Sequence, residues 1–429
     1  MRYLYSALFY SLLPLIILRM LWRSRRASGY RRRIGERFGL FAPPPELAVP
    51  AIWVHAVSVG ETVAAAPLIG ALLQEWPDYR LVVTTTTPTG SERVRALFGD
   101  RVFHVYAPWD LPGAVRRFLR RTRPVLLLIM ETELWPNMLH YSGNSGCRIV
   151  LANARLSERS AQGYARLGGL TRQMLGRLDV VACQTGADGR RFLGLGLPPA
   201  ALEVTGSIKF DLELGADLRS EALLLKRKLG APQRPVLIAA STHPGEEELV
   251  LDAFAKLRKG GPERCLLVLV PRHPERFDGV HELCLRQGWR VVRRSTGSDP
   301  GTNDDILLGD TMGELLLLLG CATVAVIGGS LVARGGHNVL EPAAWGVPVV
   351  TGPYMHNFAE ISELLTAAGA MIQLEQPAGL SGCLQALFAD PSRCQQMGRA
   401  GRRVVADNRG ASQRLFALVA QLLAADVSG

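Results

Sequence analysis

The sequence predicts two doubly wound α/β domains behind a short N-terminal membrane-anchor helix. Its 429 residues are too many for one ordinary hydrophobic core and suit two domains of about 200 residues each. Short apolar strands alternate with amphipathic helices in two successive series, the pattern of parallel sheets covered on both faces. An apolar segment followed by arginines opens the chain, as in membrane-anchored proteins.

The N-terminal segment is uncharged and mostly apolar over residues 3–18, and after Arg19 it continues to Trp22. A membrane span needs about 20 residues, which this segment reaches if Arg19 extends its charge to the headgroups. A buried core helix and a signal peptide are the alternatives, although arginines follow instead of a cleavage site. Because Pro14 and Arg19 weaken a clean span, it stays open whether this segment crosses the membrane fully or lies in one leaflet.

Two clusters of arginine give the chain much of its formal net charge of +11. The first follows the apolar segment and, by the positive-inside rule, predicts that the remaining chain lies on the cytoplasmic side. We expect the second cluster on the membrane-facing side of the first domain, with a solvated helix face as the alternative. The first cluster comprises Arg23, Arg25, Arg26, Arg31, Arg32, Arg33 and Arg37, and the second comprises Arg116, Arg117, Arg120, Arg121 and Arg123.

The net positive charge by itself does not show whether the partner is nucleic acid, an anionic lipid or an acidic substrate. Aromatic-basic interleaving, a helix-turn-helix and an RNA-binding signature are missing, which argues against a nucleic-acid scaffold. The seven cysteines are scattered and form no C-x-x-C, so neither a disulfide framework nor a zinc site is predicted. That pattern indicates a reducing compartment for the globular part.

The first series of strands is predicted before residue 211 and the second after residue 235. The charged stretch between them is helical in pattern and closes with Gly230, Pro232 and Pro235, so we interpret it as the linker. The strands expected in the first series are 52–58, 81–87, 102–106, 125–130, 148–153, 180–184 and 203–207. Those of the second are 236–240, 266–270, 291–294, 306–308, 324–327 and 347–350. The expected helices include 61–75, 89–98, 112–121, 246–259, 274–287, 358–368 and an apolar C-terminal helix, 411–425.

Three stretches begin with a small polar residue and carry a glutamate three positions later. They are Ser58–Glu61, Thr311–Glu314 and Asn338–Glu341. Each fits a helix capping box, and that role alone explains the pattern. A helix N-terminus also offers free amides and a positive dipole end to an anion, so capping and ligand binding are compatible.

The most informative stretch is VIGGSLVARGGHNVLEP at residues 326–342. An apolar strand runs into Gly328, Gly329 and Ser330, where missing Cβ atoms would let backbone amides approach a phosphate. A second glycine pair precedes a helix expected to begin near Asn338. Neither a P-loop nor a G-x-G-x-x-G occurs here, which argues against dinucleotide binding.

Other polar groups follow predicted strands. Glu131 and Glu133 end the apolar strand 125–130, where carboxylates are costly unless partnered or functional, or else face solvent. Arg272 ends another strand and suits a phosphate, with a surface turn as the alternative. Residues 241–246 (STHPGE) hold a similar position, and Lys209 lies next to the linker. We find no H-E-x-x-H, no D-x-D and no G-x-S-x-G, so the sequence predicts no metal site and no hydrolase elbow.

Taken together, these stretches closely resemble the Kdo transferases, the family that adds 3-deoxy-D-manno-octulosonic acid to the lipid A precursor. The matching motifs are HAVSVGE (55–61), METELWPN (130–137), TGSIKFD (205–211), ASTHPGE (240–246), PRHP (271–274), GDTMGE (309–314), IGGS (327–330) and GGHNVLEPA (335–343). They span nearly the whole chain, and the N-terminal anchor also matches.

The resemblance implies a GT-B fold, two Rossmann-like domains facing a cleft, with CMP-Kdo as donor and no cofactor or metal. The domain ranges expected are the anchor 1–28, an acceptor domain 29–212, a linker 213–234, a donor domain 235–408 and a helix 409–429 that returns to the first domain. It also implies a lipid A precursor (lipid IVA) as acceptor, contact with an anionic membrane surface, and a place at the cell inner membrane with the catalytic domains on the cytoplasmic side.

Roles for single residues follow from the same resemblance. Glu61 is expected to be the general base, with Glu131 and Lys209 positioning reactants and stabilising developing charge. The implied CMP-Kdo-binding residues are Ser241, His243, Pro271, Arg272, Met312, Gly313, Glu314, Gly329, Ser330, Asn338, Val339, Leu340 and Glu341. The alternative function is a GT-B transferase that uses a UDP-sugar and a lipid-linked acceptor.

Overall fold

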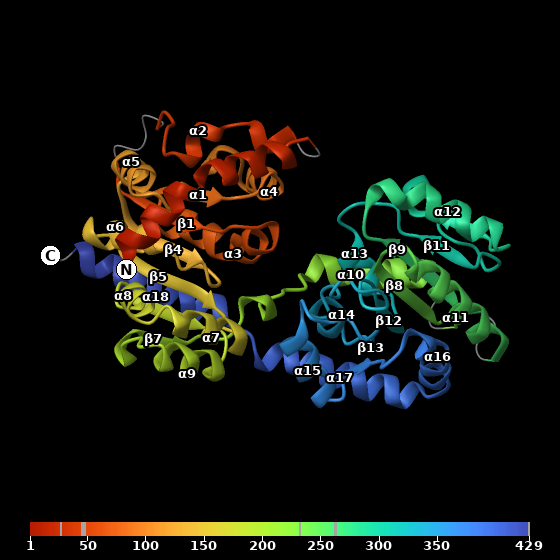
Figure 1. Cartoon of the computed structure of the whole chain (residues 1–429). Helices are drawn as coiled ribbons and strands as arrows, with labels where there is room; N and C mark the ends of the chain where they lie inside the picture. The colour runs from red at the N-terminus through yellow and green to blue at the C-terminus, as the bar shows by residue number, and fades with distance from the viewer. Residues whose placement is uncertain (26–27, 44–48, 231–232, 261–263, 428–429) are drawn as a thin grey trace. The chain divides into compact units, whose positions relative to one another are not determined.

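The computed structural model describes residues 1–25, 28–43, 49–230, 233–260 and 264–427, so Arg26 and Pro232 lie outside the described residues. The chain divides into two compact units. The first unit comprises Met1–Asp211 together with Gly410–Gly429, and the second comprises Leu212–Arg409. Each unit has its own parallel sheet and its own helices (Figure 1).

The first unit is built on a seven-stranded parallel sheet in the order β3-β2-β1-β4-β5-β6-β7. All seven predicted strands are present, most of them within two residues of the predicted ends. β1 stops three residues early because residues 56–58 turn away to start the following helix. The strands are β1 (Ala51–His55), β2 (Arg80–Thr85), β3 (Phe103–Tyr106), β4 (Pro124–Met130), β5 (Arg148–Ala154), β6 (Val180–Cys183) and β7 (Leu202–Val204).

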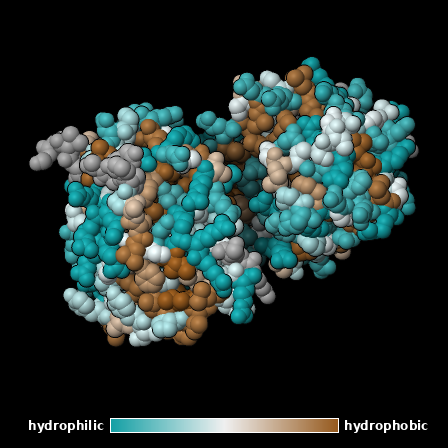
Figure 2. All heavy atoms as spheres, turned by 90° about the horizontal axis from the view of Figure 1, so that it is seen from above, coloured by the Kyte–Doolittle hydropathy of each residue, from teal (hydrophilic) through white to brown (hydrophobic). Residues whose placement is uncertain are grey.

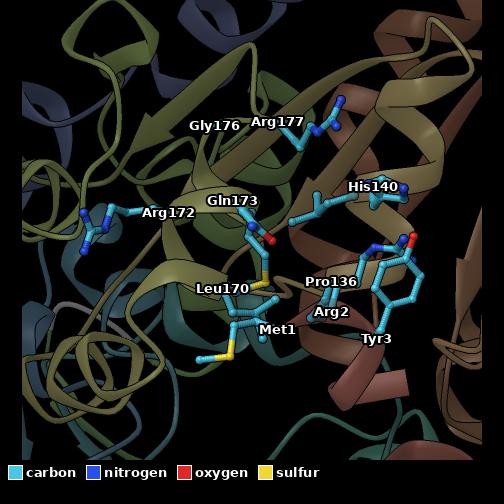
Figure 3. Close-up of a pocket in the computed structure, with 12 residues that line it drawn as sticks. Met1, Arg2, Tyr3, Pro136, His140, Leu170, Arg172, Gln173, Gly176 and Arg177 are labelled. Carbon is cyan, nitrogen blue, oxygen red and sulfur yellow. The ribbon is translucent and has the colours of Figure 1, made fainter. Parts of the chain in front are cut away.

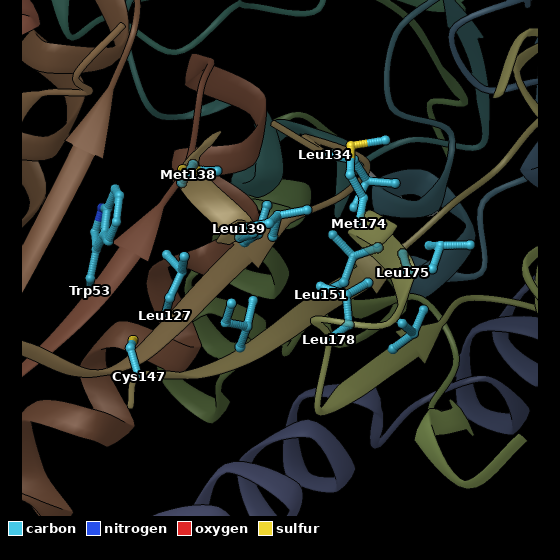
Figure 4. Close-up of a cluster of buried hydrophobic side chains, with 14 of the residues drawn as sticks. Trp53, Leu127, Leu134, Met138, Leu139, Cys147, Leu151, Met174, Leu175 and Leu178 are labelled. Carbon is cyan, nitrogen blue, oxygen red and sulfur yellow. The ribbon is translucent and has the colours of Figure 1, made fainter. Parts of the chain in front are cut away.

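Helices cover both faces of this sheet, which explains why its strands are apolar throughout. On one face Trp53 and Leu127 pack beneath Met138 and Leu139 of α6 and Met174 of α8 (Figure 4). The helices are α2 (Ile34–Arg37), α3 (Val59–Glu75), α4 (Pro88–Phe98), α5 (Pro112–Thr122), α6 (Pro136–Asn144), α7 (Glu158–Arg166), α8 (Gly169–Leu175) and α9 (Gly186–Gly194).

The core on the other face includes a helix from the far end of the sequence. α18 (Ala411–Val427) contacts α3 and β5, and Leu415 and Val419 are almost completely buried there. Two backbone amides at its start, of Gly410 and Ser412, donate to the carboxylate of Asp211. The last helix is therefore part of the first unit.

The second unit repeats the architecture with the sheet order β10-β11-β9-β8-β12-β13-β14, again all parallel. Its strands are β8 (Val236–Thr242), β9 (Leu266–Pro271), β10 (Val291–Arg293), β11 (Ile306–Leu308), β12 (Val324–Ile327), β13 (Val349–Thr351) and β14 (Met371–Gln373). β14 is absent from the predicted set, since three residues between two helical stretches carry no periodic signal. Both sheets confirm the predicted fold class of doubly wound α/β domains.

Helices again cover both faces of the second sheet. α10 forms within the segment predicted to be the linker; it buries Ala222 and Leu225 and contacts α13, so it belongs to the second unit. The helices are α10 (Ala216–Lys228), α11 (Glu246–Gly260), α12 (Phe277–Arg286), α13 (Leu315–Leu319), α14 (Leu340–Trp345), α15 (Ala359–Ala367), α16 (Leu380–Ala389) and α17 (Pro391–Asp407).

The first helix, α1 (Arg2–Arg23), is long and apolar enough to cross a membrane, and no other described helix meets that criterion. Only 11% of its most apolar window is buried, so it is not a core helix. One side lies on the first unit through Ser6 and Met20, while large apolar residues three or four positions apart stay exposed on another. These exposed residues are Leu4, Leu8, Leu12, Leu15, Leu18 and Trp22.

Candidate active site

In the first unit, the strand order reverses between β1 and β4, which is where doubly wound sheets bind ligands. Glu61 lies at this point, in the first turn of α3. The Ser58 hydroxyl accepts the Glu61 amide at 3.3 Å, and one Glu61 oxygen (Oε2) accepts the Val57 amide at 2.8 Å. The other oxygen (Oε1) accepts the Ser58 hydroxyl at 2.8 Å. The capping interpretation is therefore correct for this helix, and it fixes the carboxylate in one position.

The carboxylate of Glu61 is 8% exposed, so it reaches solvent only at its edge. Burial raises its pKa to about 7, against the opposing hydrogen bonds from Val57 and Ser58, and the charges of Glu131 and Glu133 raise the pKa further. A carboxylate with a pKa near neutrality is suited to accept a proton at physiological pH.

The segment after β4 brings further charged groups to the same end of the sheet. Glu131 has φ of 57°, a strained backbone conformation for a residue with a side chain, and its amide donates to Ala152 O at 2.9 Å. Its carboxylate lies 3.8 Å from Nζ of Lys209. Glu133 accepts the Trp135 indole N–H at 2.7 Å, and burial raises its pKa. The structure thus brings together the predicted Glu61, Glu131 and Lys209, and neither glutamate is a freely solvated loop residue.

Sequence reasoning missed two buried polar residues beside this group, His55 and Arg37. The His55 Nδ1 contacts the Thr84 hydroxyl at 2.9 Å, and its Nε2 has no partner among the described residues. Burial lowers the pKa of His55 to about 4, so the ring is neutral. Both residues line a cavity of about 140 Å³ that reaches Val57, next to the Glu61 carboxylate. His55 is the last residue of the apolar strand β1, and a polar residue in that position could have indicated a site residue from the sequence.

In the second unit, the strand order reverses between β8 and β12. There Glu246 is completely buried and accepts the amides of His243 and Gly329 on one oxygen, at 2.9 and 2.7 Å, and that of Leu331 on the other at 2.9 Å. The two chain segments cross so closely that a Cβ on Gly328 would lie 2.2 Å from Ser241 O. Glu246 was part of a matched motif but was absent from the predicted site residues.

This junction corrects one expectation about the glycine-rich turn. The Gly328 amide donates to Ala240 O, and the Gly329 amide donates to Glu246, so neither is available to a phosphate. Ser330 is fully buried, and its hydroxyl lies between Ile327 O and the Gly352 amide. The Gly328 and Gly329 amides and the Ser330 hydroxyl thus all donate within the fold. The bond from Gly328 to Ala240 joins the end of β12 to β8, so the turn has a structural role.

Four of the predicted donor-site residues line one cavity of about 150 Å³ in the second unit: Ser241, Arg272, Asn338 and Glu341. The Asn338 amide group donates to Glu341 at 3.0 Å and accepts the Leu340 amide at 3.0 Å. Burial raises the pKa of Glu341, opposed by Asn338 and by the charge of Arg272. The helix begins at Leu340, two residues later than predicted, since Asn338 forms a turn ahead of it.

His337 also lines this cavity and was not predicted. Its Nε2 lies 2.8 Å from Nε2 of His243, with the two rings nearly parallel, and His273 packs against His243 with ring centroids 5.4 Å apart. Burial lowers the pKa of His337 to about 4, helped by the charge of Arg272. One ring of the pair must donate and the other accept, which fixes their tautomers relative to each other.

The remaining predicted donor residues occupy several positions. Met312 is 67% exposed, and Gly313 has φ of 88° in the turn beside it. Glu314 forms an ion pair with Arg294 at 2.9 Å, whose hydrogen bond lowers the pKa of Glu314. Glu314 also accepts the Thr311 hydroxyl, but α13 begins only at Leu315, so this stretch is not a capping box. Pro271, Val339 and Leu340 are buried.

Several arginines of the two basic clusters make contacts within the protein. Arg37 is 4% exposed; it donates to Thr86 O at 2.8 Å and lies over the Tyr106 ring. Arg33 pairs with Glu36, and in the second cluster Arg117 and Arg121 donate to backbone carbonyls of the segment after α2. The described residues contain no group of three His, Cys, Asp or Glu side chains arranged to hold a metal ion.

Comparison with known proteins agrees with this arrangement. Residues 32–212 match a family model described as 3-deoxy-D-manno-octulosonic-acid transferase. The chain is 41% identical to the 3-deoxy-D-manno-octulosonic acid transferase of Haemophilus influenzae, over 99% of this chain and 100% of that protein. The chain belongs to the Kdo transferase family. It is 40% identical to the enzyme of the same name from Bordetella pertussis, over 96% of this chain and 97% of that one. The resemblance stated from the motifs is thus confirmed, and this Kdo transferase is a glycosyltransferase of lipopolysaccharide biosynthesis.

Two solved structures share the fold of this Kdo transferase. The Anabaena protein HepE in complex with UDP has a TM-score of 0.57 at 13% identity and covers 87% of this chain and 100% of its own. The UDP-GlcNAc 2-epimerase from Neisseria meningitidis has a TM-score of 0.56 at 13% identity, over 87% and 99% of the two chains. These likenesses concern the fold alone, and they support the GT-B class.

Proposed function

We propose that this enzyme transfers Kdo from CMP-Kdo to the lipid A precursor lipid IVA, with Glu61 as the general base. The observation that carries the proposal is the Glu61 carboxylate, which is held by Val57 and Ser58 at the switch point of the first sheet and has a pKa raised to about 7. The donor and acceptor come from the family resemblance, and the residue roles rest on the geometry of each unit.

The proposed reaction is a direct displacement. The acceptor hydroxyl oxygen forms a bond to the anomeric carbon of Kdo while the bond from that carbon to the CMP phosphate oxygen breaks. The hydroxyl proton passes to Glu61, and CMP leaves with the electron pair of the broken bond. Positioned proton transfer of this kind contributes about 10²–10⁴-fold to rate.

Glu131 and Lys209 are proposed to organise the site around the base. The separation of 3.8 Å makes a loose ion pair, and both side chains are about one-third exposed, so they remain accessible to substrates. The positive charge of Lys209 is proposed to attract the carboxylate of Kdo or a phosphate. The charge of Glu131 raises the pKa of Glu61 and so helps to keep that pKa near 7.

The cavity of the second unit is proposed to receive the nucleotide. Arg272 supplies positive charge for the single phosphate of a CMP donor, and Glu341 is placed to accept from ribose hydroxyls. The other donor-site residues stay proposed on the same basis, except that Gly329 and Ser330 act by holding the turn instead of touching phosphate. One phosphate carries less charge than a diphosphate, so the proposal needs no metal ion.

Membrane attachment is proposed through α1 in one leaflet. Both ends of the helix contact the first unit: Ser6 bonds to Asn137 near the start, and Ser24 is buried beside Arg31 at the end. The exposed apolar residues of α1 form a stripe that could contact lipid. Figure 2 shows that hydrophobic residues also reach the surface of the protein in bands between hydrophilic ones. A helix held at both ends lies along the protein surface, with the catalytic units on the cytoplasmic side.

The test is incubation of the protein with CMP-Kdo and a tetraacylated lipid A precursor, followed by mass measurement of the lipid product. We expect one or more added Kdo residues, and a Glu61→Gln variant slowed by about 10²–10⁴-fold. A Glu61→Gln enzyme with full rate would refute the base assignment while leaving the substrates standing. Transfer from UDP-sugars but not from CMP-Kdo would establish the alternative, a UDP-sugar transferase.

A further inference from the structure

A second cavity of the first unit lies apart from the candidate active site, where α1, α6 and the segment around α8 meet. It has a volume of about 510 Å³, within the usual range of small-molecule sites. Its polar lining is Arg2, His140, Arg172, Gln173 and Arg177, without any carboxylate. Its apolar lining is Met1, Tyr3, Pro136, Leu139, Leu170 and Met174. Neither Glu61 nor Glu131 borders it.

Two of the three arginines of this cavity, Arg2 and Arg177, lie on the side of His140 (Figure 3). Figure 3 shows His140 and Arg177 together on the side of α6, with Met1 and Leu170 away from them and the Arg172 side chain pointing elsewhere. Burial lowers the pKa of His140, and the charges of Arg2 and Arg177 lower it further, so the imidazole lies in the positive field of these two arginines. That field has no counter-ion inside the cavity.

Arg2 is held in place for this role. Its Nη1 donates to Asn137 Oδ1 at 3.0 Å and to the Tyr141 hydroxyl at 3.3 Å, and its guanidinium lies over the rings of Tyr3 and Tyr141. Asp110 lies near enough to Arg2 for the two charges to interact. Its carboxylate is buried and accepts the backbone amides of Asn137 and Met138. Arg177 lines the cavity and packs along the end of α6, where its Cδ would lie 3.4 Å from a Cβ on Gly143.

The positive field extends past α6. Arg116 also contacts the Tyr141 ring, with its Cζ 5.4 Å from the ring centroid, and a further cavity of about 500 Å³ is lined by Tyr141 together with Arg116, Arg117 and Arg120. The exposed apolar stripe of α1 begins at Leu4, two residues after Arg2. The arginines and the apolar lining of the first cavity therefore lie next to the start of the exposed apolar stripe of α1.

We propose that the cavity lined by Arg2, His140 and Arg177 binds the headgroup of an anionic phospholipid from the membrane. The phosphate would accept from Arg2 and Arg177, and the start of an acyl chain would lie on Met1, Leu170 and Met174. Basic pockets beside membrane helices bind phosphorylated headgroups by the same chemistry. The inference rests on the proposed membrane attachment through α1, since the headgroup plane must reach this cavity.

The test uses the full chain in a non-ionic detergent, with the imidazole resonances of labelled histidines followed by NMR. Dihexanoyl-phosphatidylglycerol, dihexanoyl-phosphatidylcholine and inorganic phosphate are titrated in turn, and a His140→Gln variant assigns the signal. We expect a saturable His140 shift with the anionic lipid, at least tenfold weaker binding of the zwitterionic lipid, and no saturable shift with phosphate. Arg177→Gln should weaken binding at least tenfold, and the exposed Arg403→Gln of α17 should not.

An unchanged His140 signal, an equal response to both lipids, or an equal response to inorganic phosphate would overturn the proposal. Short-chain lipids need no bilayer, so this result is independent of vesicle attachment by α1. Kdo transfer in detergent is measured on the same Arg177→Gln protein. Because Arg177 lies outside the candidate active site, basal transfer should be unchanged, and a loss of transfer equal to the loss of lipid binding would instead assign the cavity to the acceptor.

Discussion

At the scale of single residues, the chemistry depends on how Glu61 is held. Two hydrogen bonds fix its oxygens, and they would ordinarily lower the pKa of a carboxyl group. Burial outweighs them, and the charges of Glu131 and Glu133 act in the same direction as burial. The carboxylate of Glu61 is thus held in one position with a pKa near 7, as the proposed general base requires.

The first prediction concerns the pH dependence of transfer. Glu61 acts as a base only when deprotonated, and its pKa is raised to about 7, so the rate should rise with pH and level off above 7. At pH 6 only about one tenth of the enzyme carries the base form, which predicts a rate about tenfold below the plateau. The measurement is kcat/KM against pH. A profile that stays flat from pH 5 to 8 would contradict the assignment.

A second prediction separates the neighbouring charges from burial. Glu131→Gln removes a negative charge that raises the pKa of Glu61, so the midpoint of the pH profile should move to lower pH. The movement should be only part of the total shift, because burial is the larger cause. Glu158→Gln, on the exposed α7, is the matched control and should leave the midpoint in place. A midpoint that moves upward in Glu131→Gln would rule out this account.

That Glu61, Glu131 and Lys209 lie near one another could be expected from their positions after predicted strands, because parallel strands of one sheet bring their carboxyl ends to the same edge. His55, His337 and Glu246 were not found. Each is a single polar residue whose importance depends on what lies beside it in space, such as the three amides around Glu246. A sequence gives the position of such a residue along a strand but not the partners that another loop supplies.

At the scale of elements, buried carboxylates hold the second unit together where β8 and β12 meet. Glu246→Gln should lower the free energy of unfolding of this unit by about 1–3 kcal/mol, because an amide nitrogen would face backbone donors that now bond to a carboxylate. The measurement is urea unfolding. Glu248→Gln, exposed two residues later, should change stability by less than about 0.5 kcal/mol. Equal losses in the two variants would show that the junction is unimportant.

Another element-scale prediction concerns the exposed stripe of α1. Leu8→Glu and Leu15→Glu each remove a large apolar contact with lipid worth about 1.5–3 kcal/mol, so each should lower vesicle binding by about 10–100-fold. Flotation with anionic vesicles measures the effect. Leu223→Glu on α10 is equally exposed and serves as the control. Vesicle binding that is unaffected by both α1 substitutions would remove the proposed attachment.

Element boundaries were less accessible from the sequence than the elements themselves. The Asn338 side chain bonds to the Leu340 amide and so delays α14 by two residues relative to the prediction. The segment expected to be a linker contains α10, whose Ala222 and Leu225 are buried by tertiary contacts. Both differences come from packing that local patterns do not encode.

At the scale of the whole molecule, α18 ties the end of the sequence to the first unit. Leu415 is 1% exposed in the core beside α3, so Leu415→Ala should destabilise the first unit by about 2–5 kcal/mol. Hydrogen exchange resolves the units separately, and protection should fall in β1, β4 and β5 but not in β8 or β9. Gln421→Ala, on the exposed side of the same helix, is the control. Equal loss of protection in both units would contradict the assignment of α18 to the first.

The return of α18 also has a consequence for synthesis on the ribosome. The strands it covers are made first, yet their apolar face stays open until the whole second unit has been translated, because α18 follows that unit in the sequence. The second unit can therefore complete its fold before the first, and the growing chain carries an unfinished core in the first unit until α18 has been made.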